Sequence, residues 1–516
     1  MPEQALVVTE VRDELGYLFD APSYVDIRGA GALLESLARF TLPTLTRRRE
    51  FDGAGIVTGG RHYVATFPSA EIGQRFSDEA RRIYRQRTAA LALHATTAEV
   101  SADELLTAFG TQLRRVRQAL RQQRAAAPIQ PCSSPELRWC DACHHYPATQ
   151  QRGDELICRP CLNRRTHLSD QDARLGVPGY QSGLADAGEE DLAARPVWER
   201  QLRWFRDNSA PKGGDAASDI AALLHRRLPG DVQLADAAGC RAVIVAEVND
   251  YSWLLEQSAD SQRALRISTR LNRLLDDAFF EALGSTVWRE RSGPTNFEVL
   301  LAGGDRLVCL LPADVAPAVA ARALRTFESQ SAFATEGRRL NFCAGIGLAS
   351  AAVNWSTTAF QARQALAAAR QTYLRTAASA PRGSWRSLVG VEPVGGEQGW
   401  CVNVGELERA LAHARTLRRV GLEAVQLLPM ADALRIGSAG RLAWRTSTWT
   451  EPQRRALAAV MRDLALGAAE TDRSGGVLLW PAIATLLDWA SPIAPPASPR
   501  PRQGSEGTLP AVERSA

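Results

Sequence analysis

Residues 56–68 read IVTGGRHYVATFP, and residues 300–312 read LLAGGDRLVCLLP. Each stretch is an apolar run, a Gly-Gly pair, two polar residues, a second apolar run and a closing proline. Two short β runs around paired glycines predict a β-hairpin, because glycine adopts the positive φ of a tight turn without steric cost. The recurrence of this pattern predicts a duplicated unit of strands and helices.

The composition is typical of a multidomain protein of a reducing compartment. A chain of 516 residues with 45% hydrophobic content has room for three or four domains. Its 61 basic and 57 acidic residues leave a net charge of +4, so composition predicts no global field for polyanions. No apolar run approaches the ~20 residues of a membrane-spanning helix, and the N-terminus lacks the pattern of a signal peptide. We expect a cytoplasmic protein that contacts no membrane.

The residues around the first hairpin predict a first unit at 1–125. The run LGYLF, at 15–19, is expected to be its opening strand. The period of the apolar residues predicts helices before and after the hairpin. Ser101, with Glu104 three residues later, forms a capping box and predicts the start of a closing helix.

A second unit is expected at 239–385, around the second hairpin. The pattern predicts, in order, a strand at 241–248, a helix over 252–282, the hairpin at 298–312, a helix at 314–330, a strand at 340–350 and a last helix. This βαββαβα order is that of the ferredoxin-like core of palm domains, which transfer nucleotidyl groups. We therefore expect an α+β protein with two palm-like domains.

The remaining segments divide into a small module, connections and a C-terminal part. Residues 126–165 hold the paired cysteines, and residues 166–238 predict a flexible linker and helices. Residues 386–490 predict a helical C-terminal domain. The Pro- and Ser-rich residues 491–516 predict a disordered tail.

Two CxxC pairs predict a structural zinc site. Cys140 and Cys143 form the first pair, and Cys158 and Cys161 form the second. Each turn presents two sulfurs on one side, and two turns complete a tetrahedron with Zn–S bonds of ~2.3 Å. Four thiolates leave no open coordination position. A redox role would need a thioredoxin-like strand and helix beside one pair, which the flanking residues do not predict.

Acidic residues of the second unit predict a site for divalent ions. A palm site needs carboxylates at the end of its first strand and at the tip of the neighbouring hairpin, where they hold two ions. Glu247 ends the strand, and Asp305 lies at the hairpin tip. Asn249 and Asp250 add ligands or steering groups. Magnesium or manganese with ATP is the expected occupant.

The second hairpin tip also carries a cation. Gly303 and Gly304 are followed by Asp305 and then by Arg306. A fixed cation opposes metal binding, and Arg306 could form a salt bridge to Glu247 or Asp305. A Gly-Gly-Asp turn is also simply a tight turn with a polar tip.

The first hairpin tip, Gly59-Gly60-Arg61-His62, has no acidic residue. A metal site is therefore not expected there. Gly59 and Gly60 either admit the phosphates of a nucleotide to the hairpin backbone or form a structural turn.

With two palm-like units, a zinc module between them and a helical domain after them, the chain resembles the large subunit of type III CRISPR–Cas effector complexes. That family is related to the GGDEF nucleotide cyclases. The resemblance covers about residues 14–490 in the same domain order. Its carriers are VDIRGAGALLESL, IVTGGRHYVATFP, the CxxC pairs, AVIVAEVND, LLAGGDRLVCLLP, and FCAGIGLAS followed by AFQARQALAAARQTY.

The resemblance implies both an activity and a defect. Active members convert ATP to cyclic oligoadenylates at the second palm after the complex binds foreign RNA. Gly303, Gly304 and Asp305 match the first three positions of the family's Gly-Gly-Asp-Asp motif, and Glu247 stands where the family has a strand-end Asp. Arg306 replaces the fourth-position Asp. No His-Asp dipeptide occurs among the seven histidines, so the HD nuclease of many members is expected to be absent.

Three functions remain open. The first is a large scaffold subunit of an RNA-guided antiviral complex, with a degenerate nucleotide-binding palm; its partners are other subunits, CRISPR RNA and target RNA. The second is an active cyclic oligoadenylate synthase that uses ATP and Mg²⁺ at the second palm. The third is a stand-alone GGDEF-like nucleotide cyclase, against which the duplicated palm and the zinc module argue.

Overall fold

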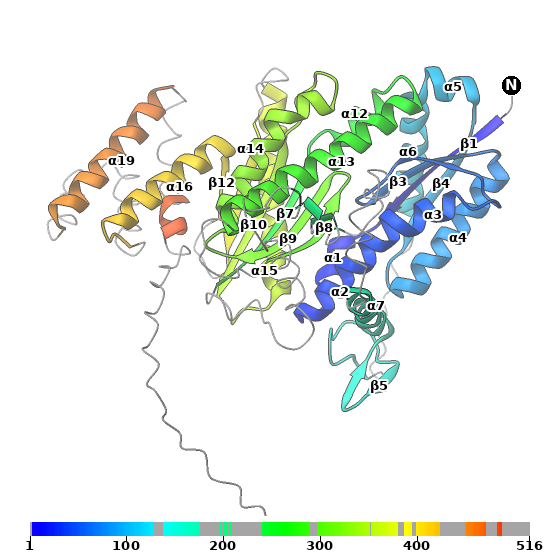
Figure 1. The fold of residues 1–516 in the computed structure, drawn as a ribbon, viewed down its shortest axis with the longest axis horizontal. Helices are drawn as coiled ribbons and strands as arrows, with labels where there is room; N and C mark the ends of the chain where they lie inside the picture. Colours follow the sequence, from blue (N-terminus) through cyan, green and yellow to red (C-terminus); the bar gives the residue numbers. More distant parts are fainter. Residues whose placement is uncertain are drawn as a thin grey trace, which may run out of the picture.

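A computed structural model describes residues 3–126, 138–175, 240–288, 297–350, 352–379, 386–394, 399–423, 449–470 and 482–487, with single helical positions between 197 and 207. The tail expected at 491–516 and most of the linker expected at 166–238 lie outside these residues. Two units of sheet and helix lie side by side, and the small cysteine module projects beneath the first (Figure 1). Among the described helices, none is long and apolar enough to cross a membrane.

The first sheet is antiparallel, with the strand order β2-β3-β1-β4. Its strands are β1 (Glu3–Val11), β2 (Ala54–Val57), β3 (His62–Phe67) and β4 (Leu93–Ser101). The helices of this unit are α1 (Glu14–Phe19), α2 (Tyr24–Glu35), the π-helical turn η1 (Ser36–Thr41), α3 (Leu42–Thr46), α4 (Ala70–Thr88), α5 (Ala102–Thr107) and α6 (Phe109–Ala126). The capping box of Ser101 and Glu104 is present at the start of α5, as expected.

The opening strand of the first unit is not LGYLF. Residues 15–19 lie in α1, and the strand forms upstream, where ALVVTEV is buried on both faces. Asp13 separates the two elements: its backbone is left-handed, with φ 51°, and its carboxylate accepts a hydrogen bond from the Gly16 amide at 3.1 Å. That cap starts the helix, so the aromatic residues that suggested a strand face the core from α1.

The second sheet has six strands in the order β12-β11-β10-β7-β9-β8. They are β7 (Cys240–Val248), β8 (Glu298–Gly303), β9 (Arg306–Pro312), β10 (Phe342–Ser350), β11 (Leu388–Pro393) and β12 (Trp400–Asn403). Among the described strands of this sheet, β10 and β11 are the pair that runs parallel. The helices are α12 (Tyr251–Glu256), α13 (Ser261–Leu283), the π-helical turn η2 (Gly284–Trp288), α14 (Ala316–Ala334), α15 (Trp355–Ser379), α16 (Val404–Arg419) and α19 (Glu451–Glu470).

Two expected elements differ in the second unit. The helix predicted over 252–282 is broken, because Asp260 is extended and caps α13 by accepting a hydrogen bond from the Arg263 amide at 2.6 Å. The helical domain predicted from 386 starts later, because β11 and β12 extend the sheet. Val389 and Val391 are fully buried in β11. Gly390 between them lies against α15, where a Cβ would come within 2.3 Å of the Ala365 carbonyl oxygen.

Both units share one strand order, since β8-β9-β7-β10 repeats β2-β3-β1-β4 with the same chain connections. The repeat extends beyond the hairpins. ALVVTEVRD at 5–13 corresponds to AVIVAEVND at 242–250. Asp13 and Asp250 both have a left-handed backbone, with φ of 51° and 59°, and each begins a six-residue helix. The duplication expected from the hairpins is therefore present in the topology.

The Gly-Gly tips of the two hairpins pack against each other. Gly60 and Gly304 both have φ +63°. A Cβ on Gly60 would lie 2.7 Å from the Gly303 carbonyl oxygen, and one on Gly304 would lie 2.6 Å from the Gly59 carbonyl oxygen. Glycine is thus required both by the backbone angle and by the approach of the other tip. Asn272 of α13 bridges the tips, donating to the Thr58 carbonyl and accepting from the Gly304 amide.

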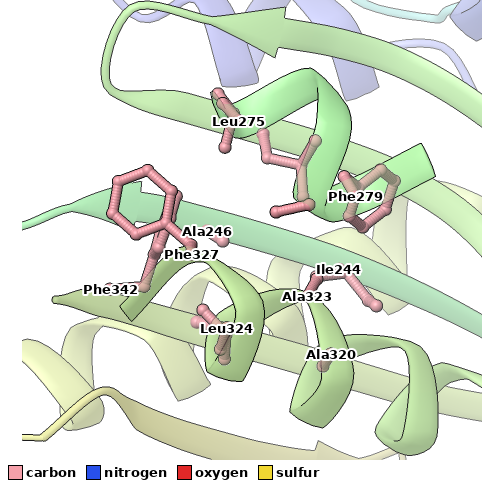
Figure 2. A pocket seen from close by; sticks show the side chains of 12 residues that line it. Ile244, Ala246, Leu275, Phe279, Ala320, Ala323, Leu324, Phe327 and Phe342 are labelled. Atoms are coloured by element: carbon pink, nitrogen blue, oxygen red, sulfur yellow. The ribbon is translucent and has the colours of Figure 1, made fainter. Parts of the chain in front are cut away.

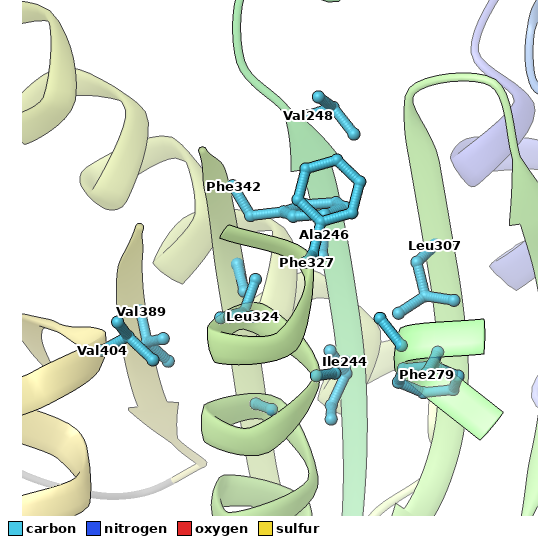
Figure 3. Close-up of a cluster of buried hydrophobic side chains, with 14 of the residues drawn as sticks. Ile244, Ala246, Val248, Phe279, Leu307, Leu324, Phe327, Phe342, Val389 and Val404 are labelled. Carbon is cyan, nitrogen blue, oxygen red and sulfur yellow. The ribbon is translucent and has the colours of Figure 1, made fainter. Parts of the chain in front are cut away.

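The core of the second unit lies between β7 and the helices α13 and α14. Ile244 and Ala246 face Phe279 and Phe327 across this layer (Figure 3). A void of about 20 Å³ remains within it, with an entirely apolar lining (Figure 2). A space of that size without polar partners is a packing gap, because a water molecule there would lack hydrogen bonds.

The contact between the tips predicts that Gly304→Ala destabilises the protein beyond the cost of its backbone angle. Gly421→Ala is the matched control, because Gly421 has φ +73° and open space around it. We expect a loss of about 1–2 kcal/mol for the control and at least ~1 kcal/mol more for Gly304→Ala. Denaturant unfolding measures both, and equal losses would contradict the contact.

Candidate functional site

A cleft of about 440 Å³ opens between the end of β1, α1, the start of β9 and α15. Four acidic and four basic side chains contribute to its lining. They come from both units and are Glu10, Asp13, Glu14, Arg61, Glu247, Arg306, Arg363 and Arg370. The cleft therefore lies where the two duplicated units meet, beside their hairpin tips.

Arg306 lies buried between two carboxylates in the wall of this cleft. Its Nη1 donates to Glu14, and its Nη2 donates to Glu247. The register of β7 and β9 places Arg306 opposite Glu247, while α1 brings Glu14 from the first unit. Burial lowers the pKa of Arg306, but the two carboxylates raise it further, so the net shift is upward. The guanidinium is therefore a permanent cation at this position.

Asp305 pairs across the tips with an arginine of the first hairpin. Its Oδ2 accepts from Arg61 Nη2 at 3.1 Å, and both side chains are largely shielded from solvent. Burial alone would raise the pKa of Asp305, but Arg61 and Arg306 outweigh it and hold the pKa below its usual value. The other oxygen, Oδ1, is buried and has no hydrogen-bond partner among the described residues.

The two ion pairs are reciprocal. Arg61 of the first hairpin pairs with Asp305 of the second unit, and Arg306 of the second hairpin pairs with Glu14 of the first unit. Burial raises the pKa of Glu14, and the nearby Arg306 opposes that shift. Removing one partner of a buried pair leaves an uncompensated charge, which typically destabilises a protein by about 3–5 kcal/mol. These pairs therefore join the units in one fixed arrangement.

His62, the residue after Arg61, is mostly shielded from solvent and neutral. Burial lowers the pKa of His62 to about 3, because Asp305, 3.9 Å away, attracts a proton too weakly to compensate. Arg61 Nε donates to His62 Nε2 at 3.1 Å, which requires that nitrogen to be unprotonated. The proton of the neutral ring therefore resides on Nδ1.

A further charged network holds the end of β8 beside the tip. Glu35 accepts from the Ala302 amide at 2.9 Å and pairs with Arg39 at 3.2 Å. Arg39 and Arg200 both donate to the Ala302 carbonyl. A Cβ on Gly303 would collide with the Arg39 guanidinium. The sequence does not predict this network, because no local motif marks residues that meet only through helix packing.

The carboxylates in this arrangement do not fit a pair of divalent ions. One oxygen of Glu247 accepts from Arg306 and the other from Arg370, at 2.6 Å. Asp305 directs one oxygen at Arg61. In the part of the chain that the structure describes, only the four CxxC cysteines form a group of three or more side chains able to hold a metal. Guanidinium groups therefore already occupy both oxygens of Glu247 and one oxygen of Asp305.

Other residues predicted for this site have different surroundings. Asn249 donates to Cys343 Sγ at 3.3 Å, and Asp250 accepts from the Tyr373 hydroxyl at 2.9 Å. Neither lines the cleft. Gly60 and Gly304 pack against the backbone of the opposite tip, and Gly303 lies against the Arg39 guanidinium.

Arg363 and Arg370 of α15 line the cleft and were not predicted. They lie seven residues apart, and therefore on one face of the helix, with side chains 44% and 52% exposed. Arg363 is 3.6 Å from Asp13, and Arg370 contacts Glu247. A usable signal existed in the sequence, since α15 contains three arginines and no acidic residue.

The four cysteines of the module are arranged as a zinc site requires. All are buried, and their sulfurs lie within 4.8 Å of one another. The sulfurs of Cys143 and Cys158 are 3.7 Å apart, close to the ~3.8 Å edge of a tetrahedron with ~2.3 Å Zn–S bonds. Strands β5 (Gln150–Arg152) and β6 (Glu155–Ile157) lie between the pairs, and α7 (Arg159–Leu175) extends the module past 165.

Consecutive arginines of α7 attach the module to the first unit. Arg164 binds Asp20 at 2.5 Å and stacks 4.0 Å over the Tyr17 ring, while Arg165 binds Asp26 at 2.7 Å. Burial raises the pKa of Tyr17 to about 12. Tyr17 and Glu14 both belong to α1, so the module packs on the helix that supplies one partner of Arg306.

No protein-family model and no curated protein match this chain. Solved structures do match it. A Csm1–Csm4 cassette in complex with cA4 has a TM-score of 0.57 at 13% identity, covering 95% of this chain and 70% of that chain. A cassette with one ATP has a TM-score of 0.54 at 12% identity, with 95% and 70% covered.

The Csm1–Csm4 subcomplex of the type III-A CRISPR-Csm interference complex has a TM-score of 0.52 at 12% identity, covering 95% of this chain and 70% of that chain. At these identities the likeness is one of fold. The chain has the fold of Csm1, the large palm-domain subunit in those assemblies. The resemblance expected from the sequence is confirmed at that level.

The neutral His62 predicts a specific pH dependence. Because its folded pKa lies below its unfolded value, the unfolded state binds the proton first as pH falls, and stability is lost below about pH 6.5. We expect His62→Gln to remove up to ~1.4 kcal/mol per pH unit from the slope between pH 5 and 6. Denaturant unfolding at several pH values measures this, with coincident slopes above pH 7 as the control. Coincident slopes below pH 6 would contradict it.

The cysteine geometry predicts about one zinc per chain. Cys158→Ser should release the metal and unfold residues 138–175 locally, because metal binding is coupled to folding of such modules. Cys401→Ser is the control, since Cys401 lies outside the cluster. Elemental analysis and limited proteolysis measure both effects. Protein purified without chelators that lacks zinc but keeps this region folded would contradict the site.

Proposed function

We propose that this chain is the large subunit of a type III CRISPR–Cas effector complex, and that its palm site holds an arginine where active relatives hold metal ions. Its two units would be the two palm domains, at 1–125 and 239–385. The match in fold over 95% of the chain to Csm1–Csm4 structures supports the subunit assignment. Its partners would be the other subunits, the CRISPR RNA and the target RNA.

The observation that carries the proposed loss of activity is the position of Arg306. Both Glu14 and Glu247 are committed to its guanidinium, and Asp305 is committed to Arg61. Two unit charges ~4 Å apart interact by roughly 4 kcal/mol at an effective dielectric near 20. A buried guanidinium therefore opposes a divalent cation strongly, and it also removes the ligand that an acidic residue at 306 would supply.

Without metal ions, the cleft lacks the groups that nucleotidyl transfer needs. Such a reaction requires activation of an attacking hydroxyl and neutralisation of charge on the leaving diphosphate. Arg363 and Arg370 could neutralise phosphate charge, but the described lining of the cleft contains no unpaired base beside them. The scaffold function follows: the subunit positions its partners and RNA while the palm does no chemistry.

An active cyclic oligoadenylate synthase is the second candidate, and the cleft itself favours it. Its volume of about 440 Å³ lies in the range of small-molecule sites. Similar structures were solved with one ATP and with cA4. Arg370 is half exposed and could exchange Glu247 for a phosphate, which would free one oxygen of that carboxylate.

The test is ATP turnover by the assembled complex with target RNA, in Mg²⁺ or Mn²⁺. We expect no cyclic oligoadenylate from the wild-type subunit. Arg306→Asp should produce it or increase it, because the variant removes the cation and restores a carboxylate. Arg325→Asp is the control, since Arg325 pairs with Glu408 on the surface and does not line the cleft.

The opposite result would establish the enzyme. Robust synthesis by the wild type, lost in both Arg306→Asp and Asp305→Ala, would contradict the scaffold proposal. The subunit assignment has its own test. Co-expression with candidate partner subunits should yield a complex that contains a guide RNA, and consistent purification of the chain alone would contradict membership.

A further inference from the structure

We propose that the outer face of α13 and the turn after α14 form a binding surface for single-stranded RNA. This arginine face consists of Arg263, Arg266, Arg270, Arg273, Arg338 and Arg339, together with Phe333. This proposal adds an RNA-binding surface to the proposed function. It rests on that function only for which RNA strand is bound. It shares no residue with the cleft.

The four arginines of α13 lie on one stripe of the helix. Their spacing of three, four and three residues keeps them on one side, and the 1.5 Å rise per residue spreads them over about 15 Å. The opposite side carries Ala264, Leu275 and Phe279, which are buried in the core. The stripe is therefore held outward by the packing of the same helix. Figure 1 shows α13 running from the first unit across the second.

The turn after α14 sets two more arginines beside the stripe. Glu336 and Gly337 have positive φ, and the Arg338 amide donates to the Thr335 hydroxyl at 3.1 Å. Arg263 Nε donates to Glu336 Oε2 at 2.9 Å, which ties the turn to α13. The Arg338 guanidinium lies 4.5 Å over the Trp253 ring. The turn is thus a fixed platform on which Arg338 and Arg339 are exposed.

The arginines of this surface carry more positive charge than its acidic residues neutralise. Six arginines face two acidic partners, Glu336 and Asp277, and Arg270 reaches Glu336 only at 3.9 Å. Arg266 and Arg339 are exposed and form no ion pair with the described residues. Arginine binds phosphate oxygens bidentately, and the counterions it releases from a polyanion supply most of the affinity.

The small number of exposed apolar side chains on this surface favours nucleic acid as its ligand over an acidic protein. Phe333 is 87% exposed, and Leu265 at 36% is the other large apolar residue exposed here among those described. A protein interface buries a contiguous apolar centre, which two separated side chains do not provide. Phe333 lies near the end of α14, five residues before Arg338 in the sequence, and an exposed ring suits the stacking of an unpaired base, which tolerates any base.

The experiment compares matched double variants of the full-length chain. The test variant, Arg266→Glu/Arg339→Glu, reverses two charges of the arginine face. The control variant, Arg415→Glu/Arg419→Glu, reverses two exposed arginines of α16 and so changes the net charge by the same amount. Fluorescence anisotropy with a labelled single-stranded RNA of mixed sequence measures binding over a salt series. We expect the face variant to bind the RNA at least roughly tenfold more weakly than the wild type. The slope of log K against log salt concentration should become shallower by about 1.4, because each phosphate contact with a single strand contributes about 0.7.

Phe333→Ala separates stacking from charge. It should weaken binding by roughly fivefold or more without changing the salt slope. Equal losses from the two double variants would overturn the proposal, because general charge would then suffice. Wild-type affinity in the face variant, or its loss of a protein partner with RNA affinity retained, would overturn it as well.

The outcomes also distinguish this inference from the proposed function. If the chain binds RNA through the face but assembles with no effector subunit or guide RNA, the surface stands and the proposed function fails. If the complex assembles and the face variant binds RNA as the wild type does, the function stands and this surface does not.

Discussion

The buried guanidinium of Arg306, held between Glu14 and Glu247, is the interaction on which the centre of this protein depends. A cation enclosed by protein must be paired, and its two partners come from different units of the chain. Satisfying it therefore fixes how the units meet. In the pair of Arg61 and Asp305, the first unit supplies the cation and the second unit supplies the carboxylate. Between these pairs, glycines allow the two backbones to touch, and any side chain there would separate them.

The duplicated unit explains how such an interface arises. Each copy places a strand end, a left-handed aspartate and a Gly-Gly tip in equivalent positions, so two copies can meet tip to tip. The residues at these positions have diverged: Glu10 faces His62 in the first copy, and Glu247 faces Arg306 in the second. One copy thus contributes a neutral histidine and a cation, while the other contributes a buried carboxylate and a cation. Two of the ion pairs, Arg61 with Asp305 and Arg306 with Glu14, therefore join one copy to the other.

The same charge balance bears on function. A site that binds divalent ions needs carboxylates whose charge is uncompensated until the ion arrives, and here arginines already compensate it. Arg363 and Arg370 add positive charge at the cleft, where an anion could bind. The cysteine module packs on α1, the helix that carries Glu14. The ion pairs at this site therefore join the two units.

The sequence alone determined the features that depend on neighbours along the chain. Paired glycines specified the hairpins, CxxC spacing specified the cysteine cluster, and a capping box specified the start of α5, because each depends on local backbone geometry. The strand ALVVTEV was missed because aromatic residues in LGYLF suggested β-structure, whereas the cap at Asp13 decided the helix. Only the tertiary structure decided which charges meet. Glu14 and Arg306 are 292 positions apart, and no periodicity relates them. Burial makes this pairing important for stability, because a charge excluded from water needs a charged partner, and the tertiary fold determines which residue that is.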